Sequence, residues 1–348
     1  MSIIIHFGMP KTGSSAIQAA LFGQALDSRF HYVSLGTANQ SGGISTIFRV
    51  DPENYHTYRR LGWTTSQIAT AKQNYEKALL HELTYAMETS KVAIISGEDI
   101  TNLRPNELRS FYKVCRSLSP NVRAVGYIRS PKAFMESAIQ QKIKMGEVSI
   151  NLARAFPRYR QLFQKFDKVF GRECTSFWKF DPSVSGDIVS DFCKRIGLPF
   201  KGPARKPVNE GLSLPALRAL CIFRRHHADR DSINYKKNIE QRIIKNLADM
   251  RGPKLYLHSS IFLPRLDEYN DEVEWMENRL EASLREDVEI HDSQAIMSLD
   301  DFYVVDPVAI EWLQTKTGDE FNRKMESSEV FIARAVSKLA TPIRHNKK

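Results

Sequence analysis

The stretch of this sequence best suited to chemistry is a short loop that follows a continuous apolar run, Ser2–Phe7, of strand length. The loop holds glycines, one lysine and three hydroxyl side chains: Gly8, Met9, Pro10, Lys11, Thr12, Gly13, Ser14 and Ser15. Because a helix is predicted to begin at Ser14, backbone N–H groups, a helix N-terminus and the Lys11 ammonium should surround one point, which favours a phosphate. Lys11 precedes Gly13, whereas the Walker pattern places its lysine after the last glycine. The other interpretation is a tight turn with Ser14 as the helix N-cap.

A second polar pair follows a later strand. The run Val122–Ile128 predicts a strand that ends directly before Arg129, and Ser137 lies about two turns into the helix expected over Pro131–Lys144. A guanidinium offers paired hydrogen bonds to a phosphate, and a hydroxyl adds one more. In the alternative interpretation Arg129 pairs with a nearby carboxylate and Ser137 lies on a helix surface.

Strands and helices alternate through the first two hundred residues. The strands expected are Ser2–Phe7, Lys91–Ser96, Val122–Ile128 and Thr175–Phe180, and the helices expected are Ser14–Leu26, Gln67–Glu88, Pro105–Ser117, Pro131–Lys144 and Ser185–Ile196. Such alternation is typical of a parallel sheet covered on both faces, with ligands beyond the carboxyl ends of the strands. The sequence therefore predicts an α/β, P-loop-like three-layer fold with a central, mostly parallel sheet flanked by helices.

The remainder of the chain predicts a helical C-terminal extension. Helices are expected over Ser213–His227 and Asn238–Met250, and the stretch Leu266–Phe302 is acidic. These helices can pack onto the same sheet, so we expect one domain over residues 1–348. Its core would span about 1–220 and its helical, partly acidic extension about 221–340, followed by a frayed tail, 341–348.

The charge of the chain is concentrated in two segments. The 348 residues carry a formal net charge of +10. Residues 123–172 hold eleven basic against three acidic side chains, and residues 201–245 hold eleven against four. This excess indicates an anionic partner and suggests that these cations line a cleft for it.

Composition also excludes several classes of protein. No apolar run approaches the ~20 residues of a membrane helix, and the first lysine follows the short apolar run at the N-terminus, unlike a signal peptide. The four cysteines have no spacing typical of zinc or redox sites, so we expect free thiols in a reducing cytoplasm and no metal. Peripheral contact with a membrane surface stays open.

Two motifs together resemble a known family. The loop Gly8–Ser15 resembles the 5′-phosphosulfate loop of sulfotransferases that use 3′-phosphoadenylyl sulfate (PAPS), and Arg129 with Ser137 resembles the family's 3′-phosphate signature. A weaker third match, Lys206–Leu214, is similar to a segment of bacterial members. The resemblance covers roughly Met1–Leu220. At Ser130 this chain departs from the many members that have aspartate there.

The resemblance implies the roles of the site residues. Lys11 would stabilise the bridging and leaving oxygens, Arg129 and Ser137 would hold the 3′-phosphate, and the 5′-phosphosulfate would be bound by Thr12, Gly13, Ser14 and Ser15. In carbohydrate-type members a glutamate at a comparable strand end is the base, which points here to Glu98, with Asp99 as the second choice. The implied activity is sulfuryl transfer from PAPS to a hydroxyl of a carbohydrate or glycolipid-type acceptor, with 3′,5′-ADP as product.

Other readings and subsites remain open at this point. A P-loop-like kinase using ATP would require a Walker order that the loop lacks. A non-enzymatic polyanion-binding protein would fit the charge, but the sequence carries no nucleic-acid-binding signature, so no nucleic acid is expected as partner. Trp178, Phe180 and Phe22 are candidates for stacking on adenine. The loop-like segment Gly42–Trp63 mixes aromatic and basic residues that would suit a saccharide acceptor.

Overall fold

A computed structural model describes residues 2–24, 26–147, 150–181, 187–200, 211–227, 233–286 and 295–340. The chain divides into two compact units. The first comprises Met1–Pro131, Pro157–Val208 and Tyr269–Glu286, and the second comprises Lys132–Phe156, Asn209–Glu268 and Asp287–Lys348. The first residues of the helix expected over Ser185–Ile196, most of the Lys206–Leu214 match and the tail 341–348 lie outside the described residues. The single domain expected from the sequence stays a prediction.

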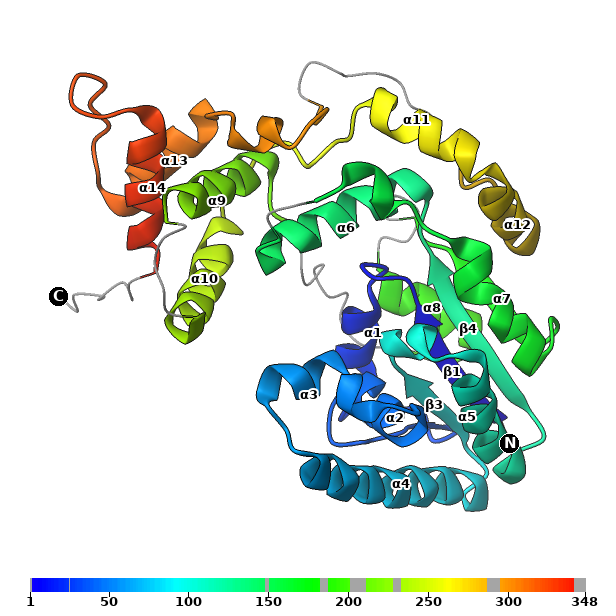
Figure 1. Ribbon diagram of the computed structural model, residues 1–348. Coiled ribbons are helices and arrows are strands. Elements are labelled where there is room, and N and C mark those ends of the chain that lie inside the picture. Colours follow the sequence, from blue (N-terminus) through cyan, green and yellow to red (C-terminus); the bar gives the residue numbers. More distant parts are fainter. Residues whose placement is uncertain are drawn as a thin grey trace. The chain divides into compact units, whose positions relative to one another are not determined.

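The first unit is built around a five-stranded sheet in which every strand runs parallel to its neighbours (Figure 1). Its order is β2-β3-β1-β4-β5, with β1 (Ser2–Gly8), β2 (Phe30–Tyr32), β3 (Val92–Ser96), β4 (Val122–Ile128) and β5 (Thr175–Lys179). The central strand, β1, is buried over nearly its whole length, as its apolar run predicts for a parallel sheet. The predicted α/β class with a parallel central sheet is confirmed.

Helices flank the sheet and complete a three-layer arrangement (Figure 1). The helices of this unit are α1 (Ser14–Leu21), α2 (Ser41–Phe48), α3 (His56–Leu61), α4 (Thr65–Glu88), α5 (Pro105–Leu118), α7 (Tyr159–Phe170), α8 (Ile188–Ile196) and α12 (Asn270–Leu280), with 3₁₀ turns η1 (Pro52–Asn54) and η2 (Glu98–Asn102). The helices predicted before β3 and β4, Gln67–Glu88 and Pro105–Ser117, are present as α4 and α5 within a few residues of their expected bounds. The helix predicted over Pro131–Lys144 is present as α6 (Pro131–Met145), and α7 was not predicted.

The two faces of the sheet have separate cores because successive strand residues point to opposite sides. On one face Ile4 and Tyr127 join a cluster with buried side chains of α1 and α8. On the other face the Phe7 ring stacks on Phe166 of α7, with ring centroids 3.9 Å apart, and meets Phe177 of β5 edge-on. The aromatic residues of the sheet thus fix α7 against it.

The register of the strands brings three chain segments to one edge of the sheet. Gly8 lies beside Tyr127 of β4, and His6 lies beside Ser96 of β3. The loop after Gly8, the turn after Ser96 and the residue after Ile128 therefore leave the sheet at the same carboxyl edge. This is the edge at which parallel α/β sheets bind their ligands.

Two elements of the first unit differ from the prediction. The segment Gly42–Trp63, expected as a loop, contains α2, η1 and α3. Gly43 lies within α2 and does not mark a turn: a Cβ there would lie 2.6 Å from the Leu35 side chain, so glycine permits close packing of the helix. Gly62 ends α3 with a φ of 65°. The edge strand β2 was not predicted, because its three residues are too few to produce a pattern.

The described part of the second unit is almost entirely helical. It contains α6 (Pro131–Met145), α9 (Leu214–His226), α10 (Ile233–Leu247), α11 (Ser259–Glu268), α13 (Pro307–Thr317) and α14 (Ser328–Lys338), with 3₁₀ turns η3 (Leu152–Ala155) and η5 (Asp300–Tyr303). One isolated bridge joins Leu257 to Ile296. The predicted helical character of this C-terminal part is confirmed.

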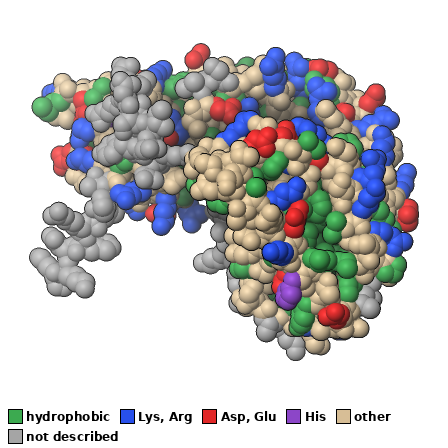
Figure 2. Space-filling view, turned by 60° about the horizontal axis from the view of Figure 1, so that its bottom comes forward, with side chains coloured by type: hydrophobic (Ala, Val, Ile, Leu, Met, Phe, Trp, Pro, Cys, Tyr) green, Lys and Arg blue, Asp and Glu red, His purple; other side chains and the backbone are tan. Residues whose placement is uncertain are grey.

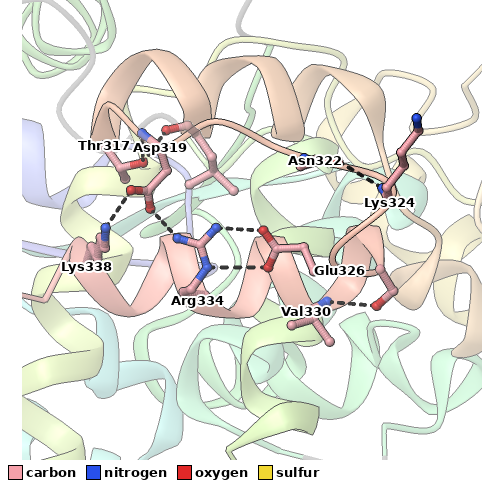
Figure 3. Close-up of polar contacts among 10 residues, drawn as sticks. Thr317, Asp319, Asn322, Lys324, Glu326, Val330, Arg334 and Lys338 are labelled. Atoms are coloured by element: carbon pink, nitrogen blue, oxygen red, sulfur yellow. Dashed lines mark hydrogen bonds and ion pairs between the residues drawn. The ribbon is translucent and has the colours of Figure 1, made fainter.

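An ion-pair network holds the chain between α13 and α14 (Figure 3). Lys338 and Arg334 of α14 both bind Asp319, at 2.5 and 2.9 Å, and Arg334 also pairs with Glu326 at 2.7 Å. The Lys338 ammonium, followed by the Arg334 guanidinium, holds the pKa of Asp319 below its usual value. The network fixes both ends of the connecting segment to one helix.

The surface carries basic and hydrophobic side chains on the same face. Figure 2 shows a strip of hydrophobic side chains, with lysine and arginine side chains gathered along the right-hand border of the view. No helix among the described residues is long and apolar enough to cross a membrane.

Candidate functional site

The loop after β1 has the backbone conformation of an anion-binding turn. Lys11 and Gly13 both have positive φ, 64° and 82°. The Thr12 hydroxyl donates to the Met9 carbonyl at 2.8 Å and is buried, so it braces the loop from inside. Gly13 is closely packed, since a Cβ there would lie 2.9 Å from the Ile188 side chain. An alternation of left-handed residues with a residue between them can turn backbone N–H groups toward a common point.

Ser14 has a buried hydroxyl without a partner among the described residues. Gly13, not Ser14, is the N-cap of α1, so the alternative interpretation of Ser14 as a cap is wrong. Ser14 is 2% exposed, and its Oγ makes no hydrogen bond within the described part of the chain. A buried hydroxyl without a partner costs stability, and it needs an explanation such as a ligand oxygen. Lys11 and Ser15, by contrast, are exposed at the rim.

Arg129 lies against the Lys11 loop. Its Nη1 donates to the Lys11 carbonyl at 3.1 Å, and its backbone carbonyl accepts from the Tyr159 hydroxyl at 2.6 Å. The guanidinium also lies 5.8 Å from the centre of the Phe180 ring. The structure therefore brings the Lys11 loop and the residue that ends the β4 motif together.

The residue after Arg129, Ser130, is hydrogen-bonded to a carboxylate that is distant in the sequence. Ser130, where the resembling family often has aspartate, donates its hydroxyl to Glu286. Glu286 also contributes to raising the pKa of Tyr159, behind the larger effect of burial. A negative charge thus lies beside the Arg129 backbone even though residue 130 is a serine.

Ser137 lies on α6, in the second unit. Its sequence spacing from Arg129 remains the basis for pairing the two residues, and its role stays a prediction.

The turn after β3 presents two carboxylates with different surroundings. The Asp99 carboxylate accepts from the Tyr55 hydroxyl at 2.9 Å and from the Asn102 amide at 2.9 Å. Glu98 is half-buried and forms no hydrogen bond or ion pair with any described residue. Burial, and then the charge of Asp99, raise the pKa of Glu98, while the Lys11 ammonium opposes the shift. Of the two, Glu98 is the carboxylate with free oxygen atoms in the part of the chain that the structure describes.

Three residues hold this turn, a role that the sequence did not predict for any of them. Gly97 is required by packing, because a Cβ there would lie 2.9 Å from the Ser41 backbone nitrogen. The Ser41 hydroxyl accepts from the Asp99 N–H at 3.0 Å, and Tyr55 of the α2–α3 segment holds the Asp99 side chain. An aromatic residue and a serine more than forty residues away give no sequence signal for these contacts.

A buried polar cluster underlies the edge of the sheet. His6 Nδ1 and the Ser96 hydroxyl lie 2.8 Å apart, and Gln18 of α1 donates to the same hydroxyl at 3.1 Å. Burial lowers the pKa of His6 to about 3, so the ring is neutral at ordinary pH. The cluster ties β1, β3 and α1 together beneath the loop and the Glu98 turn.

The aromatic residues proposed for adenine belong to the core. Phe22, Trp178 and Phe180 are partly buried and pack against the cluster around α1 and α8. Trp178 meets Tyr127 edge-on, with ring centroids 5.3 Å apart. Of the three, Phe180 is placed beside a site residue, near the Arg129 guanidinium.

Part of the basic segment 123–172 lies away from the site. Arg123 lies beside Ile4, near the amino end of β4, and is exposed, so about 20 Å of strand separates it from Arg129. Lys132 pairs with Glu136 at 2.6 Å in the second unit. The expectation that these cations line one cleft is wrong for Arg123, which lies at the opposite edge of the sheet.

Comparisons with known proteins give two similar solved structures. No family model matches the chain, and no curated protein matches it significantly. A sulfotransferase from Alicyclobacillus acidocaldarius aligns over 80% of this chain and 96% of its own, with 12% identity and a TM-score of 0.45. The sulfotransferase domain from the curacin biosynthetic pathway aligns over 60% of this chain and 77% of its own, with 12% identity and a TM-score of 0.35.

Proposed function

We propose that this protein is a sulfotransferase that moves the sulfuryl group of PAPS to a hydroxyl of an acceptor by in-line transfer. The observation that carries the proposal is the convergence of Lys11, Arg129 and Glu98 at one edge of the sheet. A cationic group, a bidentate phosphate donor and a carboxylate with free oxygens are the groups that this reaction needs.

The Lys11 loop fits the 5′-phosphosulfate end of PAPS. The buried Ser14 hydroxyl, which has no partner among the described residues, and the N-terminal N–H groups of α1 are donors of the kind an oxyanion accepts. Thr12 and Gly13 shape the loop, and Ser15 lies at its rim. PAPS would supply a sulfuryl group whose leaving group is a phosphate oxygen. Lys11 would neutralise the charge that builds on that oxygen as the bond to sulfur breaks.

Arg129, with Ser137, is the proposed holder of the 3′-phosphate. The hydrogen bond from Nη1 to the Lys11 carbonyl keeps the guanidinium beside the loop proposed for the other end of the nucleotide. The planar fork of a guanidinium suits paired hydrogen bonds to phosphate oxygens. The Glu286 carboxylate on Ser130 would take the place of the aspartate common in the resembling family.

Glu98 is the proposed base. It would accept the acceptor's hydroxyl proton on a carboxylate oxygen as the new oxygen–sulfur bond forms. Its raised pKa suits it to take up this proton better than an ordinary exposed carboxylate would. Asp99, whose two oxygens are both hydrogen-bonded, would orient the turn rather than exchange protons.

The acceptor is proposed to be a carbohydrate or glycolipid-type molecule that lies along the α2–α3 segment. This segment borders the Glu98 turn through the bond between Tyr55 and Asp99. Trp63, 36% exposed, stacks on Tyr58 with ring centroids 4.7 Å apart and offers a flat apolar face of the kind that sugar rings pack on. The four free cysteines support a reducing compartment, and we propose the cytoplasm.

A turnover assay tests this proposal. PAPS is incubated with the protein and a panel of monosaccharide, oligosaccharide and glycolipid acceptors, and release of 3′,5′-ADP is recorded. ATP is offered in parallel, with release of ADP as the readout. We expect 3′,5′-ADP release with at least one acceptor and none with ATP. Consumption of ATP without consumption of PAPS would support a kinase instead.

A further inference from the structure

A lysine of α7 reaches beneath the turn that carries Glu98. The Lys165 Nζ donates to the backbone carbonyls of Thr101, at 2.5 Å, and Leu103, at 2.7 Å. Both carbonyls belong to the end of η2, whose first residue is Glu98. All of these residues lie in the first unit, and α7 is fixed to the sheet by the stacking of Phe166 on Phe7.

These two carbonyls need an outside donor. The last carbonyls of a helical turn have no partner within the turn, and a cation at that end also complements the aligned peptide dipoles. Elsewhere the turn is held by the Thr101 hydroxyl, which donates to the Gly8 carbonyl at 3.2 Å, and by Ser41 and Tyr55 at Asp99. Lys165 therefore connects the end of the turn to α7.

The Lys165 side chain is held at an energetic cost. Burial lowers its pKa to about 8, and the carboxylate of Glu107 acts in the opposite direction. Glu107 is itself buried, and it accepts from the N–H groups of Val50 and Arg104. Lys165 and Glu107, both within the described residues, form no ion pair with each other within 4.0 Å. The hydrogen bonds of the Lys165 ammonium go to the turn, so charge compensation for Glu107 does not explain its geometry.

We propose that Lys165 is a positioning residue that fixes the Glu98 turn by binding its terminal carbonyls. Its importance for turnover rests on the proposed function, in which Glu98 is the base. Within the described part of the chain, Lys165 donates to backbone atoms of the turn and makes no hydrogen bond or ion pair with Glu98 or the Lys11 loop. Its loss should therefore move Glu98 and leave the loop as it is.

Two measurements on the free protein test the proposal without any acceptor. The first is hydrogen exchange of the backbone amides from Gly97 to Leu103. The second is the pKa of the Glu98 carboxyl, followed by NMR on protein with carbon-13-labelled glutamate and assigned with Glu98→Gln. We compare the wild type with Lys165→Met, Lys165→Arg and a control, Lys168→Met, which changes an exposed lysine on the same helix.

In Lys165→Met we expect amide exchange in the turn to accelerate about tenfold or more, because its terminal carbonyls lose their donor. The pKa of Glu98 should fall toward its ordinary value, because the loosened turn exposes the carboxyl. Lys165→Arg should restore both readouts in part, since arginine can also donate to two carbonyls, and Lys168→Met should change neither.

Unchanged exchange and an unchanged Glu98 pKa in folded Lys165→Met would overturn the proposal. If Lys165→Met does not fold, the test rests on Lys165→Arg. A Lys165→Arg variant that also fails to fold, or that shows no partial rescue, would count against a donor role for Lys165. Both readouts are independent of PAPS, so they can succeed where nucleotide binding fails. Should PAPS be turned over, Lys165→Met should lower kcat about tenfold and leave the affinity for 3′,5′-ADP unchanged.

Discussion

The Tyr55 hydroxyl donates to the Asp99 carboxylate at 2.9 Å, whereas the neighbouring Glu98 carboxylate has no hydrogen-bond partner among the described residues. Two adjacent carboxylates therefore differ in whether described residues already bind their oxygen atoms. Asp99 is bound to the α2–α3 segment and to Asn102, and it raises the pKa of Glu98 by its charge. The Glu98 oxygens accept no hydrogen bond from the residues that the structure describes, and the Lys11 charge acts to lower the pKa of this carboxyl. This division of roles leads to the first two predictions.

Glu98→Gln should abolish most turnover while nucleotide binding is retained. Loss of a general base typically costs about 10²–10⁴-fold in rate. Asp99→Asn keeps the hydrogen bond from Tyr55 and should cost about tenfold or less. Steady-state kinetics and calorimetry with 3′,5′-ADP provide the two readouts. Full activity in Glu98→Gln would remove Glu98 as the base.

The pH dependence of turnover should report the pKa of Glu98. The base acts when deprotonated, so activity should fall as the pH decreases through a pKa above that of an ordinary carboxyl. Because the charge of Asp99 raises this pKa, Asp99→Asn should move the acid limb to lower pH. Asp27→Asn, a change at an exposed carboxyl that pairs with Arg29, is the control and should leave the limb in place. If the acid limb of the pH profile does not move in Asp99→Asn, Glu98 is not the group that titrates there.

Ser14→Ala should weaken nucleotide binding without lowering the free energy of unfolding. The Ser14 hydroxyl is buried and has no partner among the described residues, so its removal should leave the free energy of unfolding unchanged or slightly higher. If the hydroxyl binds the 5′-phosphosulfate, affinity for 3′,5′-ADP and PAPS should fall about tenfold, the value of one hydrogen bond to a charged group. Ser110→Ala, on the surface of α5, should change neither quantity. Loss of stability with unchanged affinity would show that the hydroxyl has a structural partner.

His6 should make the protein less stable in mild acid. Its pKa is about 3 in the folded state and 6.5 in the unfolded chain, so only the unfolded state takes up a proton between these values. Stability is therefore lost as the pH falls below 6.5, by about 2 kcal/mol from pH 7 to pH 5. Urea titrations at both pH values should show a smaller loss in His6→Gln than in the wild type. The exposed His81→Gln serves as the control, and an equal loss in all three proteins would contradict the prediction.

Gly97→Ala should disturb the turn that carries Glu98. The new Cβ would lie 2.9 Å from the Ser41 backbone nitrogen, too close for the turn and α2 to keep their positions. We expect lower turnover and a loss of about 1–3 kcal/mol in the free energy of unfolding. Gly42→Ala is the matched control on α2, since its Cβ has room and alanine favours helix, so stability should rise by up to about 1 kcal/mol. Equal stabilities of the two variants would contradict the packing argument.

The sequence predicts the strands and the loop that form the site better than it predicts the distant residues that hold them in place. The apolar runs at β1, β3 and β4 and the loop at Lys11 are local patterns, and parallel pairing then brings Lys11, Glu98 and Arg129 to one edge. Contacts between distant segments leave no such pattern. The helix α2 was not predicted because Gly43, which serves close packing, resembles a turn glycine, and α3 has only six residues. Tyr55 and Lys165 reach the Glu98 turn from 44 residues before Asp99 and 62 residues after Leu103, a proximity that only packing produces.

Calorimetric binding of 3′,5′-ADP is the sharpest test of the proposed nucleotide site, because it needs no acceptor. We expect a single site that Lys11→Ala and Arg129→Ala each weaken about tenfold or more, since each removes a charged donor to a phosphate. The control Lys77→Ala, on the exposed face of α4, should bind as the wild type does. Absence of binding by the wild type at millimolar nucleotide, or equal affinity in all four proteins, would contradict this prediction.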